Sequence, residues 1–419
     1  MSEQGLTVAV VGGGAAGFFG AIAAATANPQ ARVTLYEAGP QPLAKVRISG
    51  GGRCNVTHHC FDPAQLVQSY PRGGKALRGA FSRFQPKDTV EWFAKRGVRL
   101  KTEPDGRMFP ITDDSGTVIA CLSRAAEQAG VTVKVRSPIV SAEKANGGFK
   151  LQLKSEQSIT CDRLLLTTGS SPTGYRIAKT LGHQLETPVP SLFTFNIADK
   201  RLHQLSGVAV NPVTVQLQID GASKKELKAL KQTGPLLITH WGFSGPAVLK
   251  LSAWAARLLH TTKYRGSVLI NWLPSLNQDQ VRSELQQLKA EKTKKAIATY
   301  SPYSPISKRL WQYLLGRIDI DSTLTWANLS KKQLNRLVQE LTQGTYAITG
   351  KGVFKDEFVT CGGVCLKEVD FKTMKSRMCD GLYLSGEILD VDGITGGFNF
   401  QNAWTTGWLA GQAIGQTIG

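Results

Sequence analysis

Residues 6–17 read LTVAVVGGGAAG. The first six are apolar and mostly β-branched, which is typical of a strand buried on both faces. The last six match the pattern G-x-G-x-x-G, in which Gly12 permits a tight turn, Gly14 lets a pyrophosphate approach the backbone and Gly17 lets a helix pack closely. The alanine-rich residues 18–27 supply that helix, and its N-terminus favours an anionic group.

An acidic residue follows at the spacing that a ribose requires. Residues 32–36 (RVTLY) predict a second strand, and Glu37 comes directly after it, 20 residues beyond Gly17. A carboxylate at this place accepts hydrogen bonds from both ribose hydroxyls and repels a 2′-phosphate. The unit therefore predicts Rossmann-type dinucleotide binding, and by itself it allows either NAD or FAD.

A second glycine-rich segment covers residues 45–57 and reads KVRISGGGRCNVT. Three successive glycines leave backbone amides free to face an anion or a flat ring. Lys45, Arg47 and Arg53 add positive charge, which suits a pyrophosphate or a reduced, anionic flavin. We interpret the segment as part of the same cofactor site.

This segment resembles the signature of the YhiN/BaiN-type flavoproteins, also described as aminoacetone oxidase-like FAD-binding enzymes. The family pattern is roughly K-x-x-x-S-G-G-G-R-C-N-x-T, and the chain matches it at Lys45, at residues 49–55 and at Thr57. In that family the segment lines FAD near the ribityl chain and the isoalloxazine. The resemblance implies non-covalently bound FAD. It extends to the apolar strand that ends in Thr168-Gly169 and covers nearly the whole chain.

The C-terminal part carries the resemblance further. Residues 381–387 (GLYLSGE) predict a short strand that ends in a Gly-Glu turn, and residues 390–403 (DVDGITGGFNFQNA) open a final helix predicted over residues 401–418. The N-terminus of that helix can face electron-rich atoms such as the flavin N1–C2=O edge. In similar flavoproteins this return crossing closes the FAD site.

The predicted cofactor contacts all come from these segments. They are Gly12, Gly14, Ala15, Ala16, Gly17, Glu37, Ala38, Lys45, Ser49, Gly50, Gly51, Gly52, Arg53, Cys54, Asn55, Thr57, Thr168, Gly169, Gly386, Glu387, Asp392, Gly396, Gly397, Phe398, Asn399, Gln401, Asn402 and Ala403. No group of cysteines and histidines has zinc-ligand spacing, so we expect no metal.

We expect an α/β fold of the two-dinucleotide-binding flavoprotein class. Its Rossmann-type FAD domain takes residues 1–190 and 351–419, with an inserted β-rich substrate subdomain over 191–275 and a helical cap over 276–350. The insert shows no second strand-GxGxxG-helix unit. NAD(P)H is therefore expected to bind transiently at the flavin, unless the substrate itself reduces the flavin and oxygen reoxidises it.

The formal net charge is +19, and residues 191–350 hold about 21 Lys and Arg against about 9 Asp and Glu. Such a balance attracts polyanions or acidic membrane surfaces, but it also fits an anionic ligand or a basic proteome. Seven scattered cysteines do not read as a disulfide framework, which favours a reducing cytoplasm. No apolar run is long enough to predict a membrane span.

Two residues are candidates for chemistry. Cys54 is expected near the flavin, but Cys60 is too distant in sequence for a C-x-x-C redox pair, so a packing role is the alternative. His240 lies in LLITHWGFSGPA (236–247), which resembles the family's FTHxGxSGPAxL stretch. It is a candidate base or substrate-orienting group, and a structural hydrogen bond is the alternative. The sequence names no catalytic base.

The leading hypothesis is a FAD-dependent oxidoreductase that transfers hydride to or from flavin N5 with a small organic substrate. The resemblance implies either amine oxidation or NAD(P)H-dependent reduction of an activated C=C bond. Residues 168–175 form a shorter loop than in relatives, so a substrate cannot be carried over directly. The alternatives are an RNA-associated flavoprotein, similar to the flavin-dependent tRNA methyltransferases and supported only by charge, and a flavin-binding protein without turnover.

Overall fold

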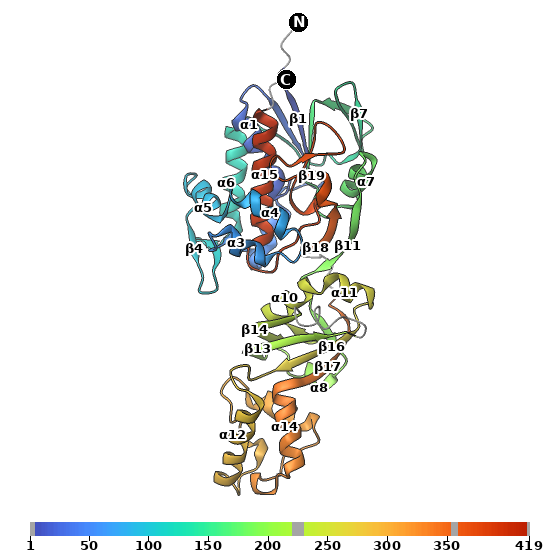
Figure 1. Cartoon of the computed structure of the whole chain (residues 1–419). Coiled ribbons are helices and arrows are strands. Elements are labelled where there is room, and N and C mark those ends of the chain that lie inside the picture. Colours follow the sequence, from blue (N-terminus) through green and yellow to red (C-terminus); the bar gives the residue numbers. More distant parts are fainter. Residues whose placement is uncertain (1–4, 220–229, 353–358, 417–419) are drawn as a thin grey trace. The chain divides into compact units, whose positions relative to one another are not determined.

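The computed structural model describes residues 5–219, 230–352 and 359–416. They form two compact units, one from segments 1–189 and 359–419 and one from segment 190–358 (Figure 1). The second unit is thus inserted into the first in sequence.

A seven-stranded sheet of order β19-β20-β21-β10-β1-β2-β6 forms the centre of the first unit. The five strands from β21 to β6 run parallel to one another, as in a Rossmann-type fold, and β20 runs antiparallel to β21. The strands are β19 (Val369–Asp370), β20 (Lys375–Ser376), β21 (Leu382–Leu384), β10 (Arg163–Leu166), β1 (Thr7–Val11), β2 (Arg32–Tyr36) and β6 (Thr132–Lys134). The predicted strand over residues 32–36 is confirmed.

Two helices that are far apart in sequence pack against each other beside this sheet. They are α1 (Ala15–Ala27) and α15 (Phe398–Gln416), which lie side by side in Figure 1. Glycines on α15 allow the approach: a Cβ at Gly407 would lie 2.6 Å from the carbonyl oxygen of Ala16, and one at Gly411 would lie 2.3 Å from that of Gly20. The C-terminal helix is thereby held along the helix that follows the glycine motif.

Smaller elements complete the first unit. They are α2 (Ala44–Ile48), the 3-10 turn Ser49–Gly52, β3 (Thr57–His58), α3 (Pro63–Leu66), α4 (Gly74–Phe81), α5 (Pro86–Ala94), β4 (Leu100–Thr102), β5 (Arg107–Pro110), α6 (Ser115–Gln128), β7 (Ile139–Ala145), β8 (Gly148–Leu153), β9 (Ser158–Cys161), α7 (Pro172–Thr180), β11 (Leu185–Ser191) and β18 (Val359–Val364). The strands β3, β5 and β4 form one small sheet, β7, β8 and β9 form another, and β11 pairs with β18.

The second unit contains a closed six-stranded barrel of order β12-β15-β14-β13-β16-β17. Alternate residues of β13, such as Val213, Val215 and Leu217, are fully buried, which accounts for the β-branched alternation in the sequence. The strands are β12 (Phe195–Ile197), β13 (Ala209–Gln218), β14 (Lys231–Ile238), β15 (Gly242–Ser244), β16 (Gly266–Asn271) and β17 (Gly344–Lys351). The Rossmann-type fold with an inserted β-rich subdomain is confirmed.

Four helices of the second unit, α8, α12, α13 and α14, begin at polar side-chain caps, whereas α10 and α11 do not. The side chains of Asn277 and Ser330 accept from backbone N–H groups three residues on, and each forms a capping box. The helices of the second unit are α8 (Lys200–His203), α10 (Pro246–Trp254), α11 (Ala256–Thr261), α12 (Gln278–Glu291), α13 (Lys308–Arg317) and α14 (Lys331–Gln343). Residues 344–350, which the sequence analysis places in the helical cap, form β17 instead, because they pair with β16 and β12 and so close the barrel.

Within the described ranges, no helix is both long and apolar enough to span a bilayer. The same residues bring together no group of three or more histidine, cysteine or acidic side chains suited to a metal ion.

Candidate flavin site

The candidate site lies where three parallel strands end. β10 pairs with β1 on one side and with β21 on the other, so their carboxyl ends are neighbours. The turn at residues 12–17 follows β1, Thr168-Gly169 follows β10, and Gly386-Glu387 follows β21. Ligands of open α/β sheets bind at this edge.

The glycines after β1 form a shallow cradle. Gly12 has a φ of +112°, and a Cβ at Gly17 would lie 2.0 Å from the Gly12 carbonyl oxygen, so neither position tolerates a side chain. A Cβ at Gly14, by contrast, would meet no described heavy atom within 4 Å. Gly14 is also the N-cap of α1 and offers no side-chain cap, so the first amides of that helix remain available to an anion.

Glu37 is fixed beside this cradle at the end of β2. Its Oε2 accepts from the Gly13 N–H at 2.8 Å and its Oε1 from the Gly39 N–H at 2.6 Å. Two backbone donors hold the carboxylate next to the glycine turn, the place expected for a ribose-binding acid. Ala38 lies between Glu37 and Gly39.

The second glycine segment forms an exposed bend. Gly50, Gly51 and Gly52 all have positive φ values, and a Cβ at Gly51 or Gly52 would meet no described atom within 4 Å. Ser49 ties the start of the bend to α2, since its Oγ donates to the Val46 carbonyl at 3.0 Å. The bend thus presents bare backbone at the surface.

Arg53 anchors this bend to the small β3-β5-β4 sheet. Its Nη1 lies 2.6 Å from Glu103 Oε1, and its guanidinium lies 4.0 Å from the centre of the Phe109 ring. The Arg53 charge is therefore partly neutralised within the protein.

The structure brings the bend together with the start of α15. With the Asn55 amide oriented to satisfy its neighbours, its oxygen accepts from the Gly397 N–H at 2.9 Å. The His58 ring stacks on Phe398 at 4.6 Å, and its Nδ1 lies 3.0 Å from the Gly396 carbonyl oxygen. Predicted contacts more than 300 residues apart in sequence are thus adjacent.

Several predicted cofactor contacts have side chains that form ion pairs or hydrogen bonds with other groups of the protein. Asp392 is fully buried and pairs with Arg72, a residue for which the sequence offered no signal. Gln401 Oε1 accepts from Thr57 Oγ1 at 2.6 Å and from Thr89 Oγ1 at 2.9 Å. Asn399 exchanges hydrogen bonds with the Gly393 backbone at 2.8 and 2.9 Å. These side chains shape the turn before α15.

Glu387 and Lys45 face each other across the site. Lys45 Nζ lies 2.5 Å from Glu387 Oε2, and Glu387 Oε1 accepts from the Thr360 N–H at 2.9 Å. Both predicted contacts thus meet in one ion pair, and Thr360 is a neighbour that the sequence did not single out.

Besides Gln85 Oε1, four buried side-chain oxygens in this unit have no hydrogen-bond partner among the described residues. They are Thr168 Oγ1, Tyr175 OH, Ser385 Oγ and Asn402 Oδ1. Buried polar atoms are rarely left unsatisfied, so such a group indicates a missing partner. Unsatisfied oxygens, an open glycine cradle and a fixed acid fit the hydroxyls, phosphates and ribose of FAD.

The two candidates for chemistry differ in their surroundings. Cys54 is fully buried, and desolvation raises the pKa of its thiol to about 12 despite a hydrogen bond with Ser49. A protonated thiol is a poor nucleophile, so the geometry favours the packing role. His240 is exposed in the second unit, in the bend between β14 and β15.

Comparison with known proteins agrees with this geometry. The profile of the family described as HI0933-like protein Rossmann domain matches residues 6–413. The chain belongs to this family. It corresponds to the YhiN/BaiN flavoproteins, and its members are FAD-dependent oxidoreductases, so the resemblance and the enzyme class predicted from sequence are both confirmed.

Among its relatives in this family is the ribosomal RNA dihydrouridine synthase of Escherichia coli, 31% identical over 97% of each chain. Another is the 3-dehydro-bile acid delta(4,6)-reductase of Clostridium scindens, 29% identical over 98% of this chain and 99% of the relative. The structure of 3-ketosteroid-delta4-(5alpha)-dehydrogenase from Rhodococcus jostii RHA1 superimposes with a TM-score of 0.52, covering 100% and 98% of the two chains. At 13% identity this likeness shows the shared fold.

Proposed function

We propose that this flavoenzyme reduces a carbon–carbon double bond conjugated to a carbonyl group. The observation that carries the proposal is the full-length similarity to two relatives whose names share that chemistry. Forming dihydrouridine saturates a ring double bond next to a carbonyl, and a delta-4 bond beside a 3-keto group is likewise conjugated. Of the two reactions that the sequence left open, this similarity favours reduction over amine oxidation.

The cofactor supplies hydride transfer, and the chain's own residues bind and orient it. The glycine cradle and the N-terminus of α1 take the pyrophosphate, and Glu37 takes the adenosine ribose. The bend at residues 49–52 and the turn before α15 take the ribityl chain and the isoalloxazine.

NAD(P)H is the proposed electron donor, and it binds transiently. The described residues of the second unit form a barrel and helices, not a second parallel sheet of the Rossmann type. The described residues of the second unit thus form no dedicated nicotinamide-binding domain, and the donor approaches the flavin directly. We assign the barrel to the substrate side and its helices to a cap, in a cytoplasmic enzyme.

The test is anaerobic mixing of the holoenzyme with NADH and with NADPH in a stopped-flow instrument. The flavin band at about 450 nm bleaches with one donor, and an α,β-unsaturated ketone then restores it faster than buffer alone. Bleaching by amines but by neither nicotinamide would instead identify an oxidase. A flavin that no donor reduces would identify a binding protein without turnover.

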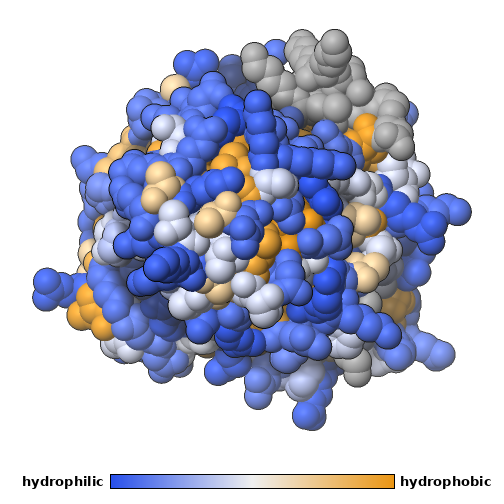
Figure 2. All heavy atoms as spheres, turned by 90° about the horizontal axis from the view of Figure 1, so that it is seen from below, coloured by the Kyte–Doolittle hydropathy of each residue, from blue (hydrophilic) through white to orange (hydrophobic). Residues whose placement is uncertain are grey.

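RNA is a second candidate for the substrate, favoured by the basic insert. The described part of the insert contains a hollow of about 360 Å³ between α12 and α14, lined by Arg282, Lys289 and Lys331 with Gln286 and Asn335. In the view of Figure 2, hydrophilic side chains dominate the face and surround a smaller apolar area. Lys224, Lys225 and Lys228 add to the charge of the insert but lie outside the described residues.

Lysines and arginines that neutralise phosphates make binding strongly dependent on salt. Retention on a ribosomal RNA fragment that falls steeply between about 50 and 200 mM salt supports RNA as the substrate. A flat salt response leaves small conjugated ketones as the substrate class.

A further inference from the structure

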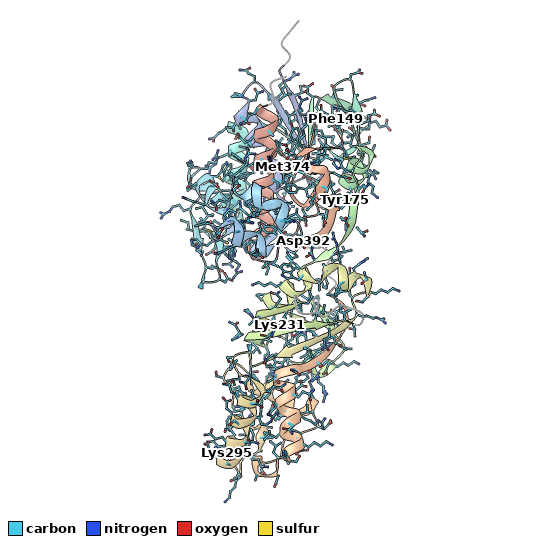
Figure 3. All side chains as sticks on the ribbon, viewed as in Figure 1. Phe149, Tyr175, Lys231, Lys295, Met374 and Asp392 are labelled. Atoms are coloured by element: carbon cyan, nitrogen blue, oxygen red, sulfur yellow. The ribbon has the colours of Figure 1, made fainter. Side chains whose placement is uncertain are left out.

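Tyr175 follows directly on the loop that begins at Thr168 and carries a buried hydroxyl that is not among the predicted cofactor contacts. The residue lies on α7, is 8% exposed, and its hydroxyl has no partner among the described residues (labelled in Figure 3). Two other buried tyrosines are satisfied, since Tyr70 donates to the Phe398 carbonyl at 2.6 Å and Tyr313 to Asp199 Oδ2 at 2.8 Å. The hydroxyl of Tyr303, in the second unit, likewise has no partner among the described residues. The hydroxyl of Tyr175 therefore lacks an acceptor.

This hydroxyl belongs to the edge of the sheet where the cofactor contacts gather. The first turn of α7 packs on the end of β10, since a Cβ at Gly174 would lie 1.8 Å from Thr168 Oγ1. A Cβ at Gly169 would lie 3.5 Å from Glu387 Oε2. Thr168, Gly169 and Glu387 are all predicted FAD contacts, and Tyr175 stands beside them.

The phenol is a donor at neutral pH. Burial raises its pKa, and the charges of Glu387 and Asp390 raise it further. Glu387 already accepts from Lys45 and from the Thr360 N–H. A protonated hydroxyl held at this edge fits a ligand oxygen, of which the ribityl-diphosphate chain of FAD has many.

We propose that Tyr175 is a cofactor-binding residue whose hydroxyl donates a hydrogen bond to an oxygen of the ribityl-diphosphate chain of FAD. The inference rests on FAD, the cofactor of the family, and not on the proposed reduction of a double bond. Tyr175 thus joins Thr168, Ser385 and Asn402 as one group of side chains completed by the cofactor.

The experiment compares Tyr175→Phe with the wild-type holoenzyme and with Tyr303→Phe. Tyr303 is a matched control, because it is buried to a similar degree (7% exposed) but lies in the second unit. FAD release on dilution gives the dissociation constant without any substrate. We expect a roughly tenfold higher constant for Tyr175→Phe and no change for Tyr303→Phe.

Thermal unfolding with and without FAD provides the second measurement. Removing an unsatisfied buried hydroxyl is neutral or stabilising, so the FAD-free Tyr175→Phe protein should unfold at the wild-type temperature or above it. The same variant should gain less stability from added FAD. An unchanged dissociation constant would overturn the proposal. So would a variant that fails to fold, because the hydroxyl would then have a structural partner. If the holoenzyme reduces no ketone, the proposed reaction fails, but the FAD dissociation constants still test the role of Tyr175.

Discussion

Lys45 and Glu387 are 342 positions apart in the sequence, yet Lys45 Nζ lies 2.5 Å from Glu387 Oε2. The pair links α2, at the start of the second glycine segment, with the turn after β21. Lys45 remains half exposed, and ion pairs of this kind add little to folding stability. Its place between two predicted FAD-binding segments suggests a role in cofactor retention.

We expect Lys45→Met to weaken FAD binding by about three- to tenfold while changing the free energy of unfolding of the FAD-free protein by less than about 1 kcal/mol. FAD release and urea unfolding measure the two quantities. Lys375→Met removes the comparable exposed pair with Asp380 and should leave FAD binding unchanged. Equal effects of both substitutions would argue for a general loss of positive charge.

Gly14→Val should separate cofactor binding from folding. A side chain at Gly14 meets no described atom within 4 Å and the residue has an extended backbone, so the chain should fold, but the added methyl groups would occupy the path of the pyrophosphate. We expect a folded, colourless protein with at least about a hundredfold weaker FAD binding. Circular dichroism and the flavin spectrum report the two properties.

Gly17→Ala is the contrasting variant. Its Cβ would lie 2.0 Å from the Gly12 carbonyl oxygen, so we expect destabilisation of about 1–3 kcal/mol as well as cofactor loss. A Gly14→Val protein that keeps its FAD would contradict the assignment of the cradle.

Cys54→Ala should leave flavin reduction by the nicotinamide within about twofold of wild type. The thiol is buried with its pKa raised to about 12, so the nucleophilic thiolate is scarce at neutral pH. The substitution removes packing, and a loss of roughly 1 kcal/mol in the free energy of unfolding is expected. Stopped-flow reduction measures the first effect. Abolished reduction in a variant that retains FAD would establish a catalytic thiol.

Stability should fall in mild acid because of His183. Its side chain is fully buried, with Nδ1 3.0 Å from Glu368 and Nε2 2.8 Å from Ser376. Desolvation lowers its pKa despite the opposing effect of Glu368, so the unfolded chain binds the proton more readily. The contribution of neutral His183 to the free energy of unfolding is complete above the unfolded pKa of about 6.5 and is lost as pH falls toward the folded pKa.

Urea unfolding at pH 7.5 and pH 5.5 tests this expectation. The wild type should lose more stability than His183→Gln between the two values. Parallel losses in the two proteins would assign the acid sensitivity to other groups.

Lys331→Glu should reduce the affinity of the protein for ribosomal RNA. The slope of log affinity against log salt concentration should become shallower by roughly 1 for each phosphate that is no longer neutralised. Lys331 is the first residue of α14, where an acidic side chain is favourable to the helix, so misfolding would not explain the weaker binding. Lys150→Glu, an exposed change on β8 of the first unit, is the control. Equal decreases in both variants would indicate binding through net charge alone.

Local patterns in the sequence predicted the Rossmann-type unit closely. β2 covers the predicted residues, and α1 begins at Ala15, three residues before the alanine-rich stretch suggested, because Gly14 acts as its N-cap. The final helix likewise begins at Phe398, before the predicted residue 401, since the Asn399–Gly393 hydrogen bonds shape the turn ahead of it. The choice of FAD, however, came from the family signature and not from periodicity.

Other features had no local signal. The predicted helical cap extends to residue 350, but residues 344–350 form β17, which pairs with β16 and β12 and so closes the barrel. Neither Arg72 nor Tyr175 is among the contacts predicted from the sequence. Only the fold places one against Asp392 and the other beside Glu387.

The sequence by itself determined the nucleotide-binding turn, because that turn depends on residue types at short spacings that set backbone conformation directly. The family and its cofactor followed from the resemblance of the second glycine segment to a known signature. Only the tertiary structure decided which predicted contacts have side chains that pair with other protein groups, as Asp392 and Gln401 do. It also decided which buried oxygens have no hydrogen-bond partner among the described residues. Those properties depend on segments hundreds of residues apart. Their mutual positions are set by the packing of α15 on α1 and by the parallel sheet, not by any local pattern.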